Sequence, residues 1–396
     1  MRAIHDWVID CDTHITEPGD VWTSRLPARF QEDAPRMVRD DDGRDSWVFG
    51  STTRLVPVGV TAVAGWPEPF PAAPKNMDEV PPASHDPVAR LAYMDEIGVW
   101  ASALYPNIGG FGNESFLGLP DEELKLACVS AYNDWLLEWC SPAPDRFIPV
   151  MAIPFWDLDA TIAEIERGAD AGHKGILFTG EPQEFGLPFL GDRHWDPLYA
   201  LAGEAGLPIS FHIGSGDFTK DFSPGRIAAH GIGPTTSRST ITLFLKNAAQ
   251  VTDLLLSGVL PRHPDTKFIS VESGVGWVPF VLESADYTFG YSNVAREKPE
   301  FEMLPSEYFA RQVYACYFYE EQSVRDDLET IGVGNVLFET DYPHPVCLYG
   351  NVREKIVGGL EARPEDQASR VLWDNAAELY GVERPPAPWP GASPPR

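Results

Sequence analysis

Two kinds of apolar stretch alternate along most of the chain. Short apolar runs are typical of buried strands, and longer segments whose apolar residues recur every three or four positions are typical of helices. The first strand begins at Val8. The pattern predicts seven further strands, at 99–105, 147–153, 174–179, 208–213, 267–273, 311–317 and 335–341. It predicts helices between them, at 87–97, 122–140, 158–171, 196–205, 241–259, 278–289 and 321–331, with more helix within 352–380.

This alternation predicts the α/β class, with a parallel sheet covered by helices. Eight strand–helix units fit a closed (β/α)8 TIM barrel. The alternative is an open doubly wound sheet, but no G-x-G-x-x-G motif follows the first strand to supply its usual nucleotide site. We therefore expect a single barrel domain over residues 1–383, in which the helices of 352–380 form a C-terminal helical extension.

Two segments depart from the alternation. Residues 19–85 form a long insertion after the first strand, with a short strand near 46–50 and a Pro-rich stretch at 66–74. A connection of this length is typically a lid or a binding loop, and the other interpretation is an excursion that packs on a neighbouring subunit. The tail, 384–396, is rich in Pro, Ala and Gly, which favours an extended or disordered segment that reaches a partner subunit.

Composition narrows the classes of function. The 396 residues are 43% hydrophobic and 22% charged, as in globular proteins. The net charge of -29 repels phosphate backbones, so we expect no nucleic-acid partner. Five cysteines without a C-x-x-C pair indicate a reducing compartment, and the sequence offers neither an apolar leader nor an 18-residue apolar run. We expect a cytoplasmic protein with no membrane contact and a small-molecule substrate.

The first strand carries three ionisable side chains, Asp10, Asp12 and His14. Residues two apart in a strand share a face, so we expect the three to point the same way. Burying them together is costly unless an opposite charge compensates. Because carboxylate and imidazole are ordinary ligands of zinc, iron and manganese, the strand predicts a metal site.

Further polar residues follow other predicted strands. The fifth strand ends in His212, the sixth in Glu272, and the eighth in Asp341, with His344 three residues later. In a (β/α)8 barrel the carboxyl ends of all strands meet at one mouth, where the active site lies. Each residue alone is a weak signal, but their convergence at one end predicts a common site.

Several of these motifs together resemble a known family. The D-x-D-x-H of residues 10–14, the E-P at 17–18, the His212 strand and the T-D-Y-P-H at 340–344 are similar to the amidohydrolase-related branch of the amidohydrolase superfamily. That branch includes aminocarboxymuconate semialdehyde, resorcylate and carboxyvanillate decarboxylases. The resemblance extends over residues 8–380.

The resemblance implies four metal ligands, Asp12, His14, His212 and Asp341. The chain departs from the family pattern at Asp12, where His or Glu is common, and at Glu272, where the decarboxylases typically have His. Glu272 is then a general acid/base, a further metal ligand, or a buried structural carboxylate. As a ligand it would provide donors for two metals, as in dinuclear iron or manganese–iron monooxygenases of the 2-aminoisobutyrate hydroxylase type.

Cationic and imidazole side chains outside this set are candidates for binding a substrate carboxylate. Arg226, His230 and Arg238 lie in the Gly-rich segment after the fifth strand, which is a binding loop or a plain surface loop. Arg54 lies in the long insertion. His344 is a partner of the ligands, a proton shuttle, or a residue that hydrogen-bonds the barrel rim.

The sequence therefore predicts a metal-dependent hydrolase or non-oxidative decarboxylase of a small carboxylated substrate, with Zn, Mn or Fe and one or two metal ions. In the decarboxylase interpretation, Asp341 and Glu272 deliver the proton that replaces CO₂. In the hydrolase interpretation, Asp341 takes a proton from metal-bound water. The alternatives are a dinuclear iron or manganese–iron monooxygenase and a non-catalytic subunit that scaffolds a homologue. We expect a homodimer or a hetero-oligomer with a homologue.

Overall fold

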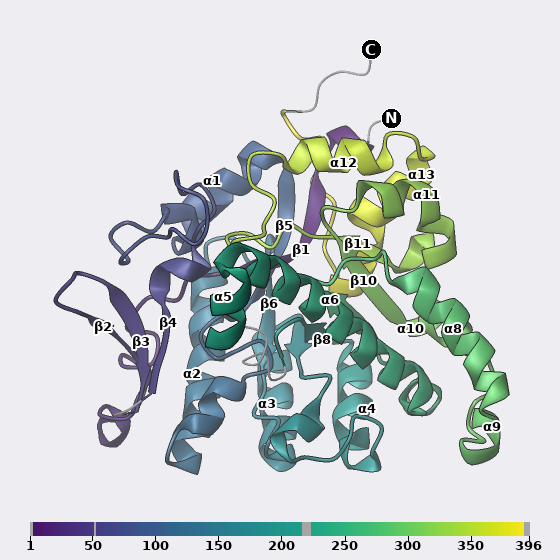
Figure 1. The fold of residues 1–396 in the computed structure, drawn as a ribbon, viewed down its shortest axis with the longest axis horizontal. Helices are drawn as coiled ribbons and strands as arrows, with labels where there is room; N and C mark the ends of the chain where they lie inside the picture. The colour runs from purple at the N-terminus through teal and green to yellow at the C-terminus, as the bar shows by residue number, and fades with distance from the viewer. Residues whose placement is uncertain (1–2, 51–52, 216–222, 392–396) are drawn as a thin grey trace.

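Eight parallel strands form the centre of the computed structural model, which describes residues 3–50, 53–215 and 223–391 (Figure 1). They follow one another in chain order around a nearly closed barrel, so the predicted (β/α)8 fold is confirmed. The strands are β1 (Val8–His14), β5 (Val99–Tyr105), β6 (Phe147–Ala152), β7 (Gly175–Leu177), β8 (Ile209–His212), β9 (Phe268–Val271), β10 (Val313–Tyr317) and β11 (Val336–Phe338). Their residues are buried almost throughout because helices cover the outside of a parallel barrel.

The barrel closes between its first strand and the segment that follows its last. The Asp341 N–H donates to the Asp12 carbonyl at 2.9 Å, and the His14 N–H donates to the Tyr342 carbonyl at 2.7 Å. Thr13 and Tyr342 form a parallel bridge at the same point. The closing hydrogen bonds thus lie at the barrel mouth and hold the polar ends of β1 and β11 against each other.

Helices surround the barrel between successive strands. Asp side chains cap three of them, since Asp86, Asp121 and Asp157 each accept a hydrogen bond from the N–H three residues on. The helices that precede β8 are α1 (Pro87–Ile97), α2 (Glu122–Cys140), α3 (Leu158–Ala171) and α4 (Asp196–Ala205). Those that follow are α5 (Pro224–His230), α6 (Ile232–Leu256), α7 (Val259–Arg262), α8 (Val278–Tyr291), α9 (Val294–Glu297), α10 (Pro305–Gln312), α11 (Glu321–Ile331), α12 (Val352–Leu360), α13 (Glu365–Ser369) and α14 (Asn375–Tyr380).

The segment after the fifth barrel strand was predicted as a loop up to residue 240, and this was wrong for its described part. The chain forms α5 and begins α6 at Ile232, nine residues before the predicted start. Thr235 and Ser239 are buried, and the Thr235 hydroxyl donates to the Gly231 carbonyl. Packing therefore overrides the weak helix propensity of Gly, Pro, Ser and Thr in this stretch.

The insertion after β1 contains a small sheet, where the sequence predicted one short strand in an irregular segment. It is antiparallel, with strands β2 (Arg36–Arg39), β3 (Asp45–Phe49) and β4 (Thr53–Pro57), and it lies outside the barrel beside α2 (Figure 1). Trp47 on β3 is fully buried and meets the ring of Trp22 edge-on at 5.3 Å. Trp22 also packs on Phe116 of the segment after β5, which ties the insertion to the barrel mouth.

The described part of the C-terminal tail packs against its own chain. The Trp389 backbone N–H donates to the Asp6 carboxylate, and its indole N–H donates to the Asp95 carbonyl. The Arg353 guanidinium lies over the Trp389 ring at 4.2 Å. Residues 387–389 thus pack beside the chain's N-terminus, whereas 392–396 lie outside the described residues. Across the described ranges, the structure has no helix with the length and apolar character needed to cross a membrane.

Candidate metal centre and active site

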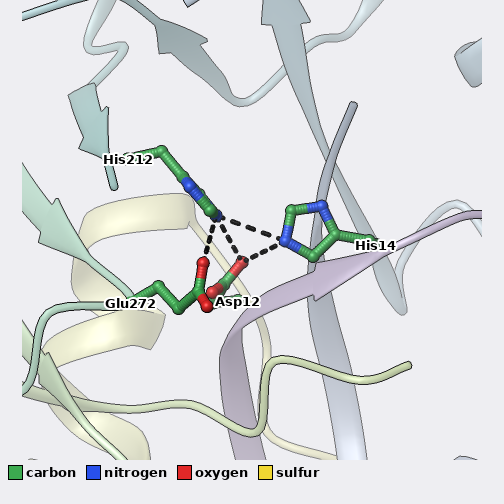
Figure 2. Close-up of side chains that lie close together, drawn as sticks. All are labelled: Asp12, His14, His212 and Glu272. Carbon is green, nitrogen blue, oxygen red and sulfur yellow. Dashed lines mark hydrogen bonds and ion pairs between the residues drawn. The ribbon is translucent and has the colours of Figure 1, made fainter. Parts of the chain in front are cut away.

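Four side chains from three barrel strands converge at the mouth (Figure 2). Asp12 and His14 come from β1, His212 ends β8, and Glu272 follows β9. The Asp12 Oδ1 atom lies 3.4 Å from His14 Nε2 and 3.5 Å from His212 Nε2. His212 Nε2 also lies 3.6 Å from Glu272 Oε2. Two imidazole nitrogens and two carboxylates therefore face one small volume.

The side chains of β1 do not alternate regularly between the two faces of the strand through residues 10–14. Its register against β5 shifts between Asp10 and Thr13, so the expectation that Asp10 shares a face with Asp12 and His14 was wrong. The Asp10 carboxylate instead accepts hydrogen bonds from the backbone N–H and the hydroxyl of Thr340, at 2.9 and 2.6 Å. Asp10 therefore joins β1 to the end of β11, and Asp12 with His14 remains at the site.

Backbone conformation directs the carboxylates that follow β9 and β11. Glu272 has a φ of 56° and Asp341 a φ of 60°, and each lies just beyond the end of its strand. Non-glycine residues rarely adopt this left-handed region, and such strain is concentrated at functional sites. The strands end earlier than predicted, and the turn out of the strand places both side chains near the histidines.

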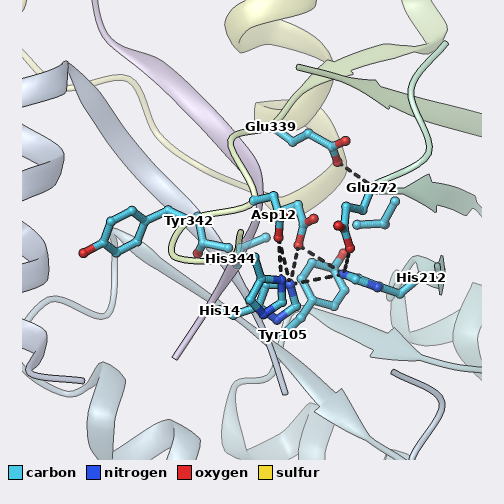
Figure 3. Close-up of polar contacts among 12 residues, drawn as sticks. Asp12, His14, Tyr105, His212, Glu272, Glu339, Tyr342 and His344 are labelled. Atoms are coloured by element: carbon cyan, nitrogen blue, oxygen red, sulfur yellow. Dashed lines mark hydrogen bonds and ion pairs between the residues drawn. The ribbon is translucent and has the colours of Figure 1, made fainter. Parts of the chain in front are cut away.

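Asp341 and His344 form a second part of the site, and Figure 3 shows His344 beside His14. Asp341 Oδ1 lies 2.8 Å from His344 Nδ1 and 3.5 Å from His14 Nε2. The His344 ring stacks on the His14 ring with 3.9 Å between centroids. His344 is therefore in contact with the ligand candidates, as the interpretation of a partner or proton shuttle requires.

The histidine rings are held in defined orientations. His212 Nδ1 lies 2.9 Å from the Ile213 carbonyl, which can only accept, so Nδ1 carries a hydrogen and Nε2 is the ring nitrogen that faces the site. The Phe111 ring stacks on His212 at 4.5 Å. Gly214 makes this contact possible, since a Cβ there would lie 3.0 Å from the Phe111 ring. The buried Arg90 guanidinium donates to the His14 carbonyl and fixes the end of β1.

Burial and like charge shape the electrostatics. Burial raises the pKa of Glu272 well above its usual range, and the nearby Asp341 adds to this effect. Burial and the charge of Asp12 likewise raise the pKa of Asp341. Burial alone would raise the pKa of Asp12, but His212 and His14 outweigh it and hold that pKa below its usual range. Without a compensating cation, the carboxyls of this cluster cannot all be ionised at neutral pH.

The donors fit a divalent metal ion. Both carboxylate oxygens of Asp12 are buried and lack a hydrogen-bond partner among the described residues, which is costly unless a cation takes that place. Two overlapping groups each offer four ligand atoms within 4.8 Å of one another. The first group is Asp12, His14, His212 and Glu272, and the second is His14, Glu272, Asp341 and His344. A mixed set of imidazole and carboxylate suits zinc, manganese or iron.

A cavity of about 210 Å³ adjoins this cluster, with Glu272 and His344 in its wall. The rest of the wall is mainly apolar and includes Phe111, Leu243 of α6, and Phe70 of the insertion. No lysine or arginine among the described residues lines it. The volume is below that of drug-sized sites and suits a molecule with a single ring.

Three of the four predicted substrate-binding residues lie outside the wall of this cavity. Arg226 is on α5, the exposed His230 ends that helix, and the exposed Arg238 is on α6, so none of the three is in the cavity wall. Arg54 is in β4, but its side chain lies outside the described residues.

The site also includes residues that sequence reasoning missed. Glu339 follows β11 and is fully buried, and its carboxylate accepts the Glu272 N–H at 3.0 Å (Figure 3). The sequence does contain a signal for Glu339, because it is an acidic residue directly after an apolar strand. Asn107 and Phe111, in the segment after β5, reach His344 and His212, but nothing in the sequence distinguishes them from other loop residues.

Comparisons with known proteins show the family of this chain and agree with its fold. The family model described as Amidohydrolase matches residues 9–382. Gamma-resorcylate decarboxylase of Rhizobium radiobacter is 24% identical over 274 residues, which cover 64% of this chain and 76% of that protein. An amidohydrolase structure from Mycobacterium avium subsp. paratuberculosis K-10 has a TM-score of 0.72 at 24% identity and covers 95% of this chain and 99% of its own. The dihydroxybenzoic acid decarboxylase of Polaromonas sp. JS666, solved with manganese and 2-nitroresorcinol, has a TM-score of 0.62 at 18% identity, covering 96% and 98%.

Proposed function

The chain belongs to the amidohydrolase family, and we propose that it is a metal-dependent, non-oxidative decarboxylase of a small aromatic carboxylate. The observation that carries the proposal is the buried cluster of imidazoles and carboxylates beside a small apolar cavity. Relatives that are 24% identical over 274 and 306 aligned residues are named gamma-resorcylate decarboxylases, and resorcylate is a single-ring carboxylate. A ring of that size suits the cavity, and the absence of a described cationic wall residue leaves the metal as the partner of the substrate carboxylate.

The ligands we propose are Asp12, His14 and His212, with Glu272 and Asp341 beside them. A manganese, zinc or iron ion bound there would supply positive charge to the substrate carboxylate and to a neighbouring oxygen. Hydrogen bonds outside the ligand set orient the ligands: the Ile213 carbonyl accepts from His212 Nδ1, and the Arg90 guanidinium donates to the His14 carbonyl at the end of β1. The apolar wall packs on the ring of the substrate and excludes water.

The reaction replaces a carboxylate by a proton. The bond between the ring and the carboxylate carbon breaks, CO₂ leaves, and the electron pair of that bond takes a proton to form C–H. We assign the reacting proton to Glu272, in the cavity wall, and to Asp341, which lies between His14 and His344. The His344 Nδ1 atom, 2.8 Å from Asp341 Oδ1, is the contact that orients the Asp341 carboxyl.

Carbon dioxide release from 2,6-dihydroxybenzoate and related hydroxybenzoates tests the proposal directly. The protein is purified without oxygen, its metals are measured by elemental analysis, and it is assayed as isolated and after reconstitution with Mn²⁺ or Zn²⁺. We expect one metal ion per chain, CO₂ release without oxygen, and loss of activity on metal removal. No turnover of any aromatic carboxylate by the reconstituted protein would contradict the proposal and favour a scaffold subunit.

The role of Glu272 is tested by Glu272→Gln. We expect this variant to keep its metal and to lose turnover, because the amide cannot donate an acidic proton. Asp145→Asn, at an exposed position away from the cluster, is the matched control and should keep both. Loss of metal from Glu272→Gln would instead make Glu272 a ligand.

The overlap of the two ligand groups favours a second candidate function, a dinuclear monooxygenase. His14 and Glu272 belong to both groups, and a carboxylate can bridge two ions. This candidate requires two metal ions per chain including iron, and oxygen consumption with an electron donor. Finding that stoichiometry together with no CO₂ release would replace the decarboxylase proposal.

A further inference from the structure

The E-P motif after the first strand has no part in the function described so far. Glu17 is buried, with 1% of its surface exposed. Its Oε1 atom accepts hydrogen bonds from the backbone N–H groups of Asn107 and Ile108, at 2.8 and 3.1 Å. The carboxylate at the end of β1 therefore holds the start of the segment that follows β5.

The side chain of Asn107 is fixed in turn. Its Nδ2 atom donates to the Ile15 carbonyl at 2.7 Å, and a carbonyl can only accept. The amide must therefore direct Oδ1 to the other side, where it lies 2.6 Å from His344 Nε2. Because Oδ1 also only accepts, His344 Nε2 must carry a hydrogen.

This bond determines what His344 presents to Asp341. In the neutral ring, a hydrogen on Nε2 leaves Nδ1 with a lone pair, and Nδ1 is the atom 2.8 Å from Asp341 Oδ1. The stacking of the ring on His14 keeps it in this plane. The orientation of the ring thus depends on contacts from β1 and from the segment after β5, outside the ligand groups.

We propose that Asn107, clamped by Glu17, is a positioning residue that holds His344 in the Nε2–H tautomer, with Nδ1 turned to Asp341. The value of this arrangement for catalysis rests on the proposed function. With Nδ1 as an acceptor, His344 can receive a hydrogen bond from a protonated Asp341 and so fix the direction of that carboxyl. In the other tautomer an N–H would occupy that contact and Nε2 would face Asn107 without a hydrogen.

The tautomer is measured without any substrate. Protein labelled with ¹⁵N-histidine and loaded with Zn²⁺, which is diamagnetic, gives two-bond ¹H–¹⁵N correlations that distinguish the two tautomers, and His344→Gln identifies the His344 signals. We expect the Nε2–H pattern in the wild type. Asn107→Leu should lose it, whereas Asn107→Asp, which keeps an acceptor for Nε2–H, should retain it. An unchanged His344 pattern in Asn107→Leu would overturn the proposal.

Kinetics then separate positioning from folding. We expect Asn107→Leu to lower kcat for aromatic carboxylate decarboxylation by about 10- to 100-fold, with KM and metal content unchanged and partial rescue in Asn107→Asp. Asn375→Leu is the matched control, because this buried amide donates to the Val333 and Val336 carbonyls, away from the site, and should lower stability alone. If the wild type releases no CO₂, the proposed function fails, but the tautomer spectra still decide the role of Asn107.

Discussion

At the scale of single residues, Asp12 is the side chain on which the metal site most depends. Both of its buried oxygens lack a hydrogen-bond partner among the described residues, while two histidine nitrogens face them. We expect Asp12→Asn to weaken metal binding by at least about 100-fold, since an amide is a poor substitute for a ligating carboxylate. Metal per chain after dialysis against a weak chelator measures this. Asp10→Asn is the matched control, and equal metal loss in both variants would contradict the assignment.

The second prediction at this scale concerns Glu17 and pH. Burial raises the pKa of Glu17 to about 7, above that of a glutamate in an unfolded chain. Between about pH 4 and pH 7, Glu17 therefore holds a proton in the folded protein that it has lost in the unfolded chain. The protonation of Glu17 stabilises the folded protein by at most about 3.5 kcal/mol; this stabilisation is fully present below about pH 4 and is lost as the pH rises through about 7.

Glu17→Gln cannot titrate, so its free energy of unfolding should fall less than that of the wild type between pH 5 and 8. Urea denaturation of the metal-free protein at several pH values measures the difference. The exposed Glu361→Gln should follow the wild-type profile. If Glu17→Gln also follows it, Glu17 does not carry a raised pKa in the folded state.

At the scale of elements, the insertion after β1 contributes directly to the cavity. Phe70 lies in its wall, and the insertion is anchored by Trp47 and Trp22. We expect Phe70→Ala to raise KM for an aromatic carboxylate about 10-fold with metal content unchanged, because about 1–2 kcal/mol of apolar contact is lost. Phe189→Ala, at a distant exposed ring, is the control. An unchanged KM would place the substrate ring elsewhere.

The positions of the barrel strands could be predicted from the sequence, because strands of a parallel barrel are buried on both faces and appear as continuous apolar runs. The start of α6 could not be predicted, because its stability comes from packing of Thr235 and Ser239 and not from helix propensity. Glu272 and Asp341 could be found because barrel strands share one mouth. Asn107 could not, since only the folded chain brings it to His344.

At the scale of the whole molecule, the net charge of -29 opposes the approach of an anionic substrate. Salt screens this repulsion, because the Debye length falls from about 30 Å at 0.01 M to about 8 Å at 0.15 M ionic strength. We expect KM for an aromatic carboxylate to fall several-fold over this range, with kcat unchanged, since bound substrate lies against the metal and the cavity wall. The inhibition constant of an uncharged phenol of the same size should not change. A KM that rises with salt would show that positive potential at the mouth outweighs the charge of the surrounding surface.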